Sequence, residues 1–205
     1  DVVFIKNIDN VVIEELTENS SFYKKMLAGK LLWIQNKVFG YLRKIAENNV
    51  DDECVKDVKS FLWNELNIKD IPDDVEKIED LLNRPIRVCG MVKNIGAAGG
   101  GPFWAKDDTG KTTLQIVELA QINTKDEHQQ TLITQATHFN PVDLVCGLRD
   151  FKGKKFDLTK FTDPNTGFIT KKSENGVFIK ALELPGLWNG GMANWNTVFV
   201  EVPLS

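Results

Sequence analysis

Several short segments of the sequence carry residues whose chemistry suits a bound ligand. The first follows an apolar stretch at the start of the chain, where Lys6-Asn7-Ile8-Asp9-Asn10 puts a carboxylate directly after Val2–Ile5. In open α/β sheets, ligands and metals bind at the carboxyl ends of strands, so Asp9 is a candidate metal ligand. The same residues are typical of an Asx turn or a helix cap, and the spacing alone favours that alternative.

A glycine-rich loop is the second candidate. Glycine fills four of the six positions from Gly96 to Gly101. Such a loop lets a ligand approach the backbone and can point several N–H groups at an anion, which makes Gly99, Gly100 and Gly101 candidate ligand-binding residues. The spacing matches neither the Walker nor the dinucleotide fingerprint. A sharp bend pressed against another backbone is the alternative.

Polar side chains gather next to a later apolar run. His138, Asn140 and Asp143 lie within Thr134–Asp143, just before Leu144–Gly147. Three polar side chains next to an apolar strand are typical of a binding site at a strand end. The alternative is a hydrogen-bonded histidine with a structural role, which is the more common function of a single histidine beside a strand.

The segment Leu184–Asn196 is rich in Trp, Asn and Gly and nearly free of charge. Tryptophan and asparagine together suit the stacking and hydrogen bonding of a ring, as in sugar or base recognition. Trp188 and Asn189 are therefore candidate ligand-binding residues. Tryptophans that close a core under a long loop are an equally good reading of the same composition.

Strands must position these residues, and the composition predicts where they lie. Apolar and β-branched runs between turn signals predict strands that belong mostly to one mixed sheet. They are Val2–Ile8, Ile86–Val92, Phe103–Lys106, Thr112–Glu118, Leu144–Leu148 and Thr197–Val202. The Asp107–Gly110 turn indicates a hairpin between the third and fourth of them. Gln121–Gln130 is expected to be a surface loop or one helical turn, and Phe151–Gly176 a set of turns and short strands.

The first part of the chain is mainly helical by its periodicity. A long helix is expected to start at Ser20 or Ser21 and to end at Asn48-Asn49. Its apolar residues recur at steps of three and four: Tyr23, Leu27, Leu31, Ile34, Val38, Leu42 and Ile45. A second helix starts at Asp51 or Asp52, and a third has Pro72 in its first turn and ends before Pro85. These helices are expected to pack the core and to carry no chemistry.

Composition excludes some classes of partner. The net charge of −4 gives no electrostatic reason to expect a nucleic acid or an anionic membrane as partner. No apolar run reaches the roughly 20 residues that span a bilayer. The three cysteines, Cys54, Cys89 and Cys146, are widely spaced and are expected to be reduced, which suits the cytoplasm. The sequence contains no Cys-x-x-Cys or His-x-x-x-His pair, and this disfavours a metal site of those kinds.

Longer motifs make the chain similar to a bacterial domain-of-unknown-function family. They cover most of the chain from Arg84 onwards: Arg84–Val92, Gly99–Trp104, Thr137–Val145 and Leu182–Gly190. Full-length members look longer, with an upstream glycine-rich segment similar to the phosphate loops of nucleotidyltransferases. The resemblance therefore implies the C-terminal portion of a longer protein whose N-terminal portion is missing here.

The resemblance also implies a fold and a set of roles. Asn7-Ile8-Asp9-Asn10 looks like the strand-end segment of nucleotide-sugar pyrophosphorylases, where the aspartate lies beside the metal and the nucleotide. The expected fold is α/β, a mixed parallel and antiparallel sheet with helices, similar to part of a nucleotide-diphospho-sugar transferase. Asp9 would bind Mg²⁺, with Lys6 and Lys93 as catalytic helpers and the Gly99–Gly101 amides on the phosphates. His138, Asn140, Asp143, Trp188 and Asn189 would select the sugar.

One α/β unit is expected over residues 1–205, with a strand plus helices in 1–83 and mostly β structure in 84–205. Its expected ligand is a nucleotide-sugar or a sugar phosphate. Ala97-Ala98 stands where the family resemblance leads us to expect Glu-Pro, and long helices follow Asp9 where a pyrophosphorylase continues differently. Two alternatives to an enzyme therefore stay open. One is a non-catalytic carbohydrate- or nucleotide-binding module, and the other is a structural half that completes another domain.

Overall fold

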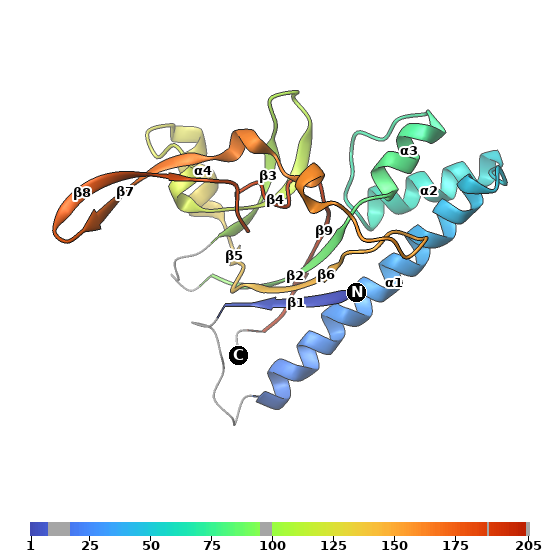
Figure 1. Cartoon of the computed structure of the whole chain (residues 1–205), viewed down its shortest axis with the longest axis horizontal. Helices are drawn as coiled ribbons and strands as arrows, with labels where there is room; N and C mark the ends of the chain where they lie inside the picture. Colours follow the sequence, from blue (N-terminus) through green and yellow to red (C-terminus); the bar gives the residue numbers. More distant parts are fainter. Residues whose placement is uncertain (8–16, 95–99, 188, 204–205) are drawn as a thin grey trace.

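The computed structural model describes residues 1–7, 17–94, 100–187 and 189–203. It confirms the mixed α/β class expected from the sequence. One strand and three helices precede a region in which most elements are strands (Figure 1). The helices are α1 Thr17–Ala46, α2 Asp52–Asn64, α3 Val75–Leu82 and α4 Glu127–Gln135. The strands are β1 Val2–Lys6, β2 Ile86–Lys93, β3 Gly101–Lys106, β4 Thr112–Val117, β5 His138–Phe139, β6 Asp143–Gly147, β7 Phe168–Glu174, β8 Val177–Glu183 and β9 Asn196–Glu201. Short 3₁₀ helices span Leu119–Gln121, Leu158–Phe161 and Pro164–Thr166.

Strand β2 is the centre of a five-stranded sheet. On one side it pairs antiparallel with β6 and, at its end, with β5, while β9 pairs with it in parallel and β1 pairs with the far side of β6. Every residue of β2 except Lys93 is buried. A strand covered on both faces must be apolar nearly throughout, which is why Ile86–Val92 shows no alternation in the sequence.

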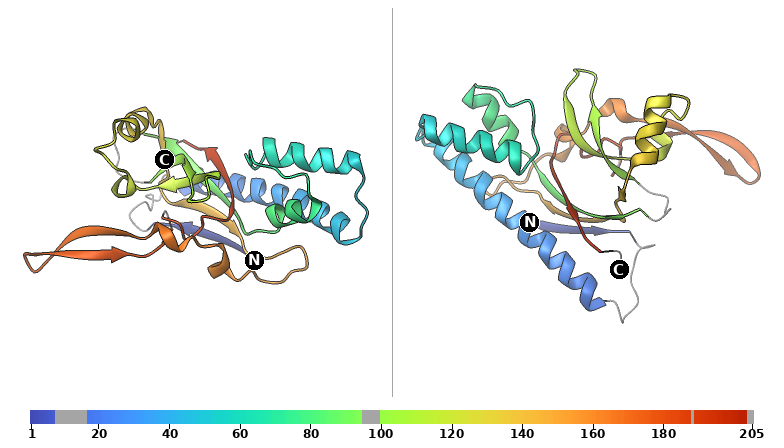
Figure 2. Two further views of the ribbon diagram at one scale, coloured as in Figure 1. Left: turned by 90° about the horizontal axis from the view of Figure 1, so that it is seen from above. Right: turned by 180° about the vertical axis from the view of Figure 1, so that it is seen from behind.

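Four of the six predicted strands lie in this mixed sheet, as β1, β2, β6 and β9, which confirms the expectation that they lie mostly in one sheet. Two hairpins stand apart from it: within the described residues, β3 forms a ladder with β4 alone, and β7 with β8 alone. The Asp107–Gly110 turn does form the β3–β4 hairpin, with Lys106 opposite Thr112. Figure 2 shows the β7–β8 hairpin projecting from one end of the molecule and α2 with α3 at the other end. We call the β7–β8 hairpin the arm.

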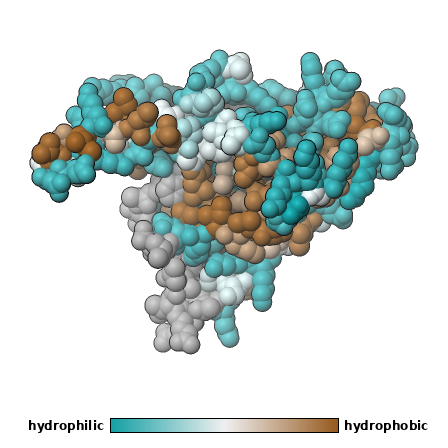
Figure 3. Space-filling view, viewed as in Figure 1, coloured by the Kyte–Doolittle hydropathy of each residue, from teal (hydrophilic) through white to brown (hydrophobic). Residues whose placement is uncertain are grey.

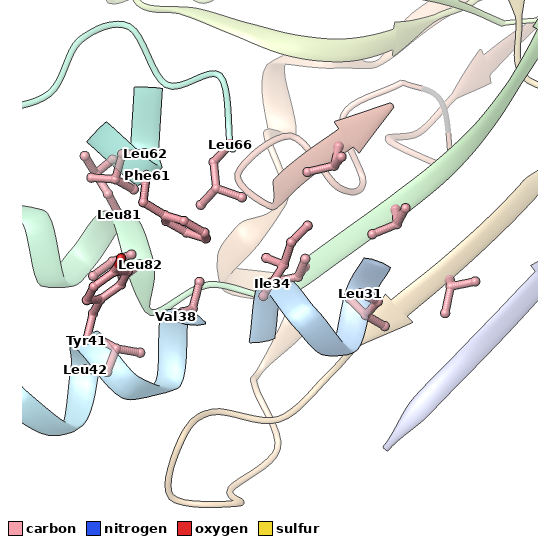
Figure 4. Packing of buried hydrophobic residues seen from close by; sticks show 14 of the residues in the cluster. Leu31, Ile34, Val38, Tyr41, Leu42, Phe61, Leu62, Leu66, Leu81 and Leu82 are labelled. Carbon is pink, nitrogen blue, oxygen red and sulfur yellow. The ribbon is translucent and has the colours of Figure 1, made fainter. Parts of the chain in front are cut away.

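The helices cover one face of the sheet. The apolar stripe of α1 packs with α2, α3 and the strands into a single buried cluster that includes Leu31, Ile34, Val88 and Val198 (Figure 4). Leu31 and Ile34 have no exposed surface. The stripe predicted from the sequence is therefore the surface that joins the helical part of the chain to the sheet.

Several helix boundaries differ from the sequence prediction. α1 begins at Thr17, before the serines expected to cap it. α3 begins at Val75, because the Asp74 carboxylate caps the N–H groups of Glu76 and Lys77, so Pro72 lies before the helix. The polar segment expected as a loop or a single turn contains α4, whose Asp126 cap bonds His128 N and Gln129 N.

A second, smaller core lies on the other face of the sheet. It joins Cys89 and Cys146 of the sheet to Ile116 of the β3–β4 hairpin and to Trp195. All three cysteines of the chain are free thiols, as expected. Burial raises the pKa of Cys89 to about 11 and that of Cys146 to about 12, so both are neutral core residues at physiological pH.

Within the described ranges, none of the helices combines the length and the apolar character needed to cross a bilayer.

Candidate functional site

The strand pairing is irregular between β5 and β6, and several residues singled out in the sequence lie there. Val92 pairs with Phe139, whereas Cys89 pairs with Leu144, so two extra residues are inserted on the β5–β6 side. A β-bulge of this kind bends a strand and is common beside functional sites. Val142, inside the bulge, has a φ of 57°, a left-handed conformation that a β-branched residue seldom adopts.

Asn140 holds this bulge together. Its side-chain Nδ2 donates to Gly90 O at 2.8 Å, and its Oδ1 accepts from Val142 N at 3.1 Å. Its backbone N–H donates to Gly100 O at 2.8 Å, which brings Gly100 of the glycine-rich loop against the bulge. Asn140 is buried. The structure thus brings Asn140 and Gly100 together, with Gly101 starting β3, and gives Asn140 a structural function.

His138 and Lys93 form a polar cluster at the end of β2. The two residues are register partners, and Glu201 of β9 reaches both of them. Glu201 Oε2 lies 3.4 Å from His138 Nε2, and Glu201 Oε1 lies 3.9 Å from Lys93 Nζ. His138 Nδ1 lies 2.8 Å from Thr137 Oγ1. Lys93 and Glu201 are mostly exposed, so their ion pair contributes little to stability.

Lys6 and Asp143 lie elsewhere. They are register partners whose Nζ and Oδ2 atoms are 3.4 Å apart and largely buried. Alternation along a strand places Asp143 on the face opposite to Leu144, and His138 on the face of Cys89 and Leu144. His138 and Asp143, which the resemblance assigned together to the sugar, therefore lie on opposite faces of the sheet.

The remaining sequence candidates divide into two groups. Asp9, Gly99 and Trp188 lie outside the described residues. Asn189 is buried, where its Oδ1 accepts from Gly186 N at 2.6 Å and its Nδ2 donates to Leu184 O at 3.0 Å. Its side chain thus closes the loop in which it lies. Among the residues that the structure describes, no group of three or more His, Cys, Asp and Glu side chains could hold a metal ion.

A groove that the sequence did not indicate lies at the other end of β2, where that strand begins. It has a volume of about 910 Å³ and is lined by residues of the segment after α2, of helix α3 and of the tip of the β3–β4 hairpin. Its lining consists of Lys69, Asp70, Ile71, Pro72, Lys77, Asp80, Leu81, Arg84, Thr109, Gly110 and Lys111. Four of these residues are cations and two are carboxylates. We call this cavity the basic groove.

Arg84 and Lys111 are the partly buried cations of the basic groove. Burial lowers the pKa of the Lys111 ammonium, and the charge of Arg84 lowers it further, against the opposing effect of Asp107 and Asp70. Burial also lowers the pKa of the Arg84 guanidinium, against the effect of Asp80. Two cations that repel each other in a partly desolvated site are stabilised by an anion placed between them.

Neither cation forms an ion pair within the part of the chain that the structure describes, although Asp80 attracts Arg84, and Asp70 and Asp107 attract Lys111, from a greater distance. Arg84 Nε donates to the Asp80 carbonyl at 2.8 Å, while its Nη groups and the Lys111 ammonium form no ion pair or hydrogen bond with another described residue. A guanidinium with free Nη groups matches a phosphate or carboxylate with two parallel hydrogen bonds, and an ammonium supplies a compact second charge. Arg84 and Lys111 therefore both have hydrogen-bond donors that no described residue occupies.

Sequence reasoning missed Arg84 and Lys111 for a physical reason. Arg84 looks like the last residue before a proline, and Lys111 like the exposed end of a hairpin turn. They are 27 positions apart (111 − 84) in the sequence. Only the packing of the β3–β4 hairpin beside α3 brings them together, and no spacing rule reports that packing.

The comparisons with known proteins agree with the resemblance of the motifs at the level of the family. No curated protein matches the chain. The sequence matches a family model over residues 1–205. This range includes the helices, the β-bulge, and Arg84 and Lys111 of the basic groove. The chain accordingly belongs to the family described as Domain of unknown function (DUF4301).

Proposed function

We propose that this chain binds a phosphorylated small molecule, a sugar phosphate or a nucleotide-sugar, and that its phosphate lies between Arg84 and Lys111. The observation that carries the proposal is the pair of adjacent, partly buried cations that form no ion pair with a described carboxylate, although Asp70, Asp80 and Asp107 attract them from a greater distance. A partly buried cation that forms no ion pair costs stability, which a bound anion offsets.

Phosphate fits this site better than a single carboxylate does. Lys69 and Lys77 also line the basic groove, so positive charge continues on both sides of the Arg84–Lys111 pair. The Lys69 ammonium lies 4.1 Å from the centre of the Trp63 ring, which holds it near the groove. Four cations suit the two or more charges of a phosphate or diphosphate. Because the whole chain is acidic, with a net charge of −4, this attraction is local to the groove.

Mg²⁺ belongs to the proposal only as a companion of the phosphates, since a diphosphate commonly carries it. Asp9 is the carboxylate that the resemblance offers for the ion. Nucleotidyl transfer with Lys6 and Lys93 as helpers would act at the opposite end of β2, where Lys6 is paired with Asp143 and Lys93 with Glu201. Binding at the basic groove therefore has more support than transfer chemistry, and the chain is proposed as a binding module.

Isothermal titration calorimetry tests the proposal. Inorganic phosphate, pyrophosphate and glucose 1-phosphate are titrated into the protein with and without Mg²⁺. Lys111→Gln and Arg84→Gln are each expected to weaken binding about tenfold to a hundredfold, because a charge-assisted hydrogen bond contributes about 1.5–3 kcal/mol.

The matched control is Lys171→Gln. Lys171 is an exposed lysine of the arm, on the far side of the molecule from α3 (Figure 2). Its replacement removes the same charge without touching the basic groove and is expected to leave the affinity unchanged. Equal affinity of the wild type and the Lys111→Gln variant, or an equal loss in the control, would refute the site.

A further inference from the structure

A second cavity adjoins the basic groove through Lys111, whose side chain lines both. It has a volume of about 260 Å³ and lies between the β3–β4 hairpin and the loop around Asn189–Asn194. We call it the hairpin pocket. Thr113 and Ala193 line the hairpin pocket and also the small cleft that continues from Arg84 and Lys111. A ligand whose phosphate lies beside Lys111 can therefore extend directly into the hairpin pocket.

The wall of the hairpin pocket is rich in uncharged polar groups. Thr113, Gln115, Gln121, Thr166 and Asn194 contribute hydroxyl and amide groups to it. The Asn194 amide forms no hydrogen bond with any described residue, and Gln121 uses its Oε1 to accept from Glu118 N at 3.1 Å, leaving its Nε2 free. Both amides line the hairpin pocket and can donate and accept hydrogen bonds there.

The remaining wall is held rigidly by internal hydrogen bonds. Gln115 Nε2 donates to Ala193 O at 2.8 Å and to Thr113 Oγ1 at 3.0 Å, while its Oε1 accepts from Arg87 Nη2 at 3.1 Å. Thr166 Oγ1 lies 2.7 Å from Asn189 O, which ties the opposite wall to the loop. A wall whose rotamers are fixed in this way is pre-organised for a ligand.

Arg87 adds charge behind this wall. Its side chain is 1% exposed, and its Nε donates to Thr197 Oγ1 at 2.8 Å, so both of its identified partners are neutral. No carboxylate within the described ranges forms an ion pair with it. A buried guanidinium stays charged. The electronegative oxygens of a ligand in the hairpin pocket are therefore attracted towards the Gln115 wall.

We infer that the hairpin pocket receives the sugar ring of the ligand whose phosphate lies in the basic groove. This inference rests on the proposed function and narrows its ligand to a hexose phosphate, free or as the sugar end of a nucleotide-sugar. The volume of about 260 Å³ is below the roughly 300–1,000 Å³ of pockets for drug-sized ligands, which suits a single ring. The described lining contains no aromatic side chain for stacking a base, whereas hydroxyl and amide groups pair with sugar hydroxyls.

The test compares ligands that share a phosphate and differ in the attached group. Inorganic phosphate, phenyl phosphate, glucose 1-phosphate, mannose 1-phosphate and N-acetylglucosamine 1-phosphate are titrated by calorimetry. The wild type is expected to bind at least one hexose phosphate more tightly than both inorganic phosphate and phenyl phosphate. Asn194→Ala and Gln121→Ala are each expected to weaken that hexose phosphate about three- to tenfold and to leave inorganic phosphate unchanged, because each removes a neutral hydrogen bond.

Asn64→Ala is the control, since it removes an exposed amide from α2, away from the hairpin pocket. Two results would overturn the sugar pocket while phosphate binding still depends on Lys111 and the phosphate site is retained. One is a wild type without any preference for a hexose phosphate, and the other is an absence of effect in Asn194→Ala and Gln121→Ala. A wild type that binds neither inorganic phosphate nor any hexose phosphate would overturn both.

Discussion

At the scale of single residues, Asn140 shows how a side chain can replace a missing strand hydrogen bond. The two extra residues of the bulge leave Gly90 O without a regular backbone partner from β6, and the Asn140 amide supplies the donor. Its other end holds the N–H of Val142, the residue with the unfavourable φ. One amide thus satisfies two buried groups and stabilises a strained residue.

We therefore expect Asn140→Ala to destabilise the protein strongly. Two buried backbone groups lose their partners, and each costs about 1–3 kcal/mol, so the free energy of unfolding should fall by about 2–5 kcal/mol. Urea denaturation followed by circular dichroism measures the change. Asn165→Ala serves as the control, because Asn165 is exposed. A loss below about 1 kcal/mol in Asn140→Ala would contradict this explanation of the bulge.

The lowered pKa of Lys111 predicts that phosphate affinity and protein stability change with pH in opposite directions. Partial burial lowers the pKa of Lys111 in the folded chain below that of an ordinary lysine, so as pH rises it loses its proton earlier than it would in the unfolded chain. In the free protein the cost of burying the charge disappears in this pH window, and the contribution of Lys111 to stability rises with pH. Phosphate binding needs the charge, so the affinity should fall over the same window.

Calorimetric titration of inorganic phosphate from neutral pH up to about pH 10 measures this effect. The wild type should lose affinity as pH rises, whereas Lys111→Gln should bind weakly and with little pH dependence. An affinity of the wild type that stays constant up to the ordinary lysine pKa would exclude Lys111 as a ligand of the phosphate.

At the scale of elements, the loop that forms one wall of the hairpin pocket depends on a glycine. Gly190 has a φ of 91°, and a Cβ on it would overlap the Thr166 hydroxyl. Gly190→Ala therefore adds a steric clash to the backbone strain and should lower the free energy of unfolding by about 2–4 kcal/mol.

Gly153 provides the matched comparison for that substitution. Its φ is 81°, but nothing lies within 4 Å of the position of a Cβ, so Gly153→Ala carries the backbone strain alone. Its expected cost is about 1–2 kcal/mol. Thermal and urea unfolding of both variants gives the difference. Equal costs would show that the loop moves away from Thr166 and that this wall is not rigid.

The elements were largely predictable from the sequence, and their arrangement was not. The stripe from Tyr23 to Ile45 and the apolar run Ile86–Val92 are local patterns, so α1 and β2 follow from them directly. The β3–β4 hairpin follows from its turn, but its separation from the main sheet depends on which faces find a partner in three dimensions. For the same reason the distant Arg84 and Lys111 come close together only in the folded chain, whereas the opposite faces of His138 and Asp143 follow from strand alternation.

At the scale of the whole molecule, the two ends of β2 have different surroundings. At its start, α3 and the β3–β4 hairpin rise on either side and enclose the basic groove with unpaired cations. At its end, Glu201 lies beside both Lys93 and His138. Of these two ends, the start of β2 has the partly buried cations that form no ion pair with a described residue, which is why the proposed ligand lies there and not beside the bulge.

The arm contributes area to the surface but little to the fold. β7 and β8 pair only with each other, and Ile169, Phe178 and Leu182 are 68%, 84% and 67% exposed. Figure 3 shows apolar side chains on the projecting arm, apart from the apolar surface at the centre of the molecule. Side chains that remain in water in the folded chain gain little from folding, so the arm should add almost nothing to the free energy of unfolding.

Removal of the outer half of the arm tests this division of the molecule. Thr170 and Ala181 are register partners, so residues 171–180 can be replaced by an Asn-Gly turn that keeps the base of the hairpin paired. The expected change in Tm is below about 3 °C, since about 1 kcal/mol shifts the Tm of a chain of this size by about 2–4 °C. Ile34→Ala, which empties a fully buried position of the core under α1, costs about 2–5 kcal/mol and should lower Tm by well over 5 °C. Differential scanning calorimetry compares the two variants. If shortening the arm lowered Tm as much as Ile34→Ala does, the arm would be part of the cooperative core. Its exposed apolar side chains would then be covered when the protein is in solution.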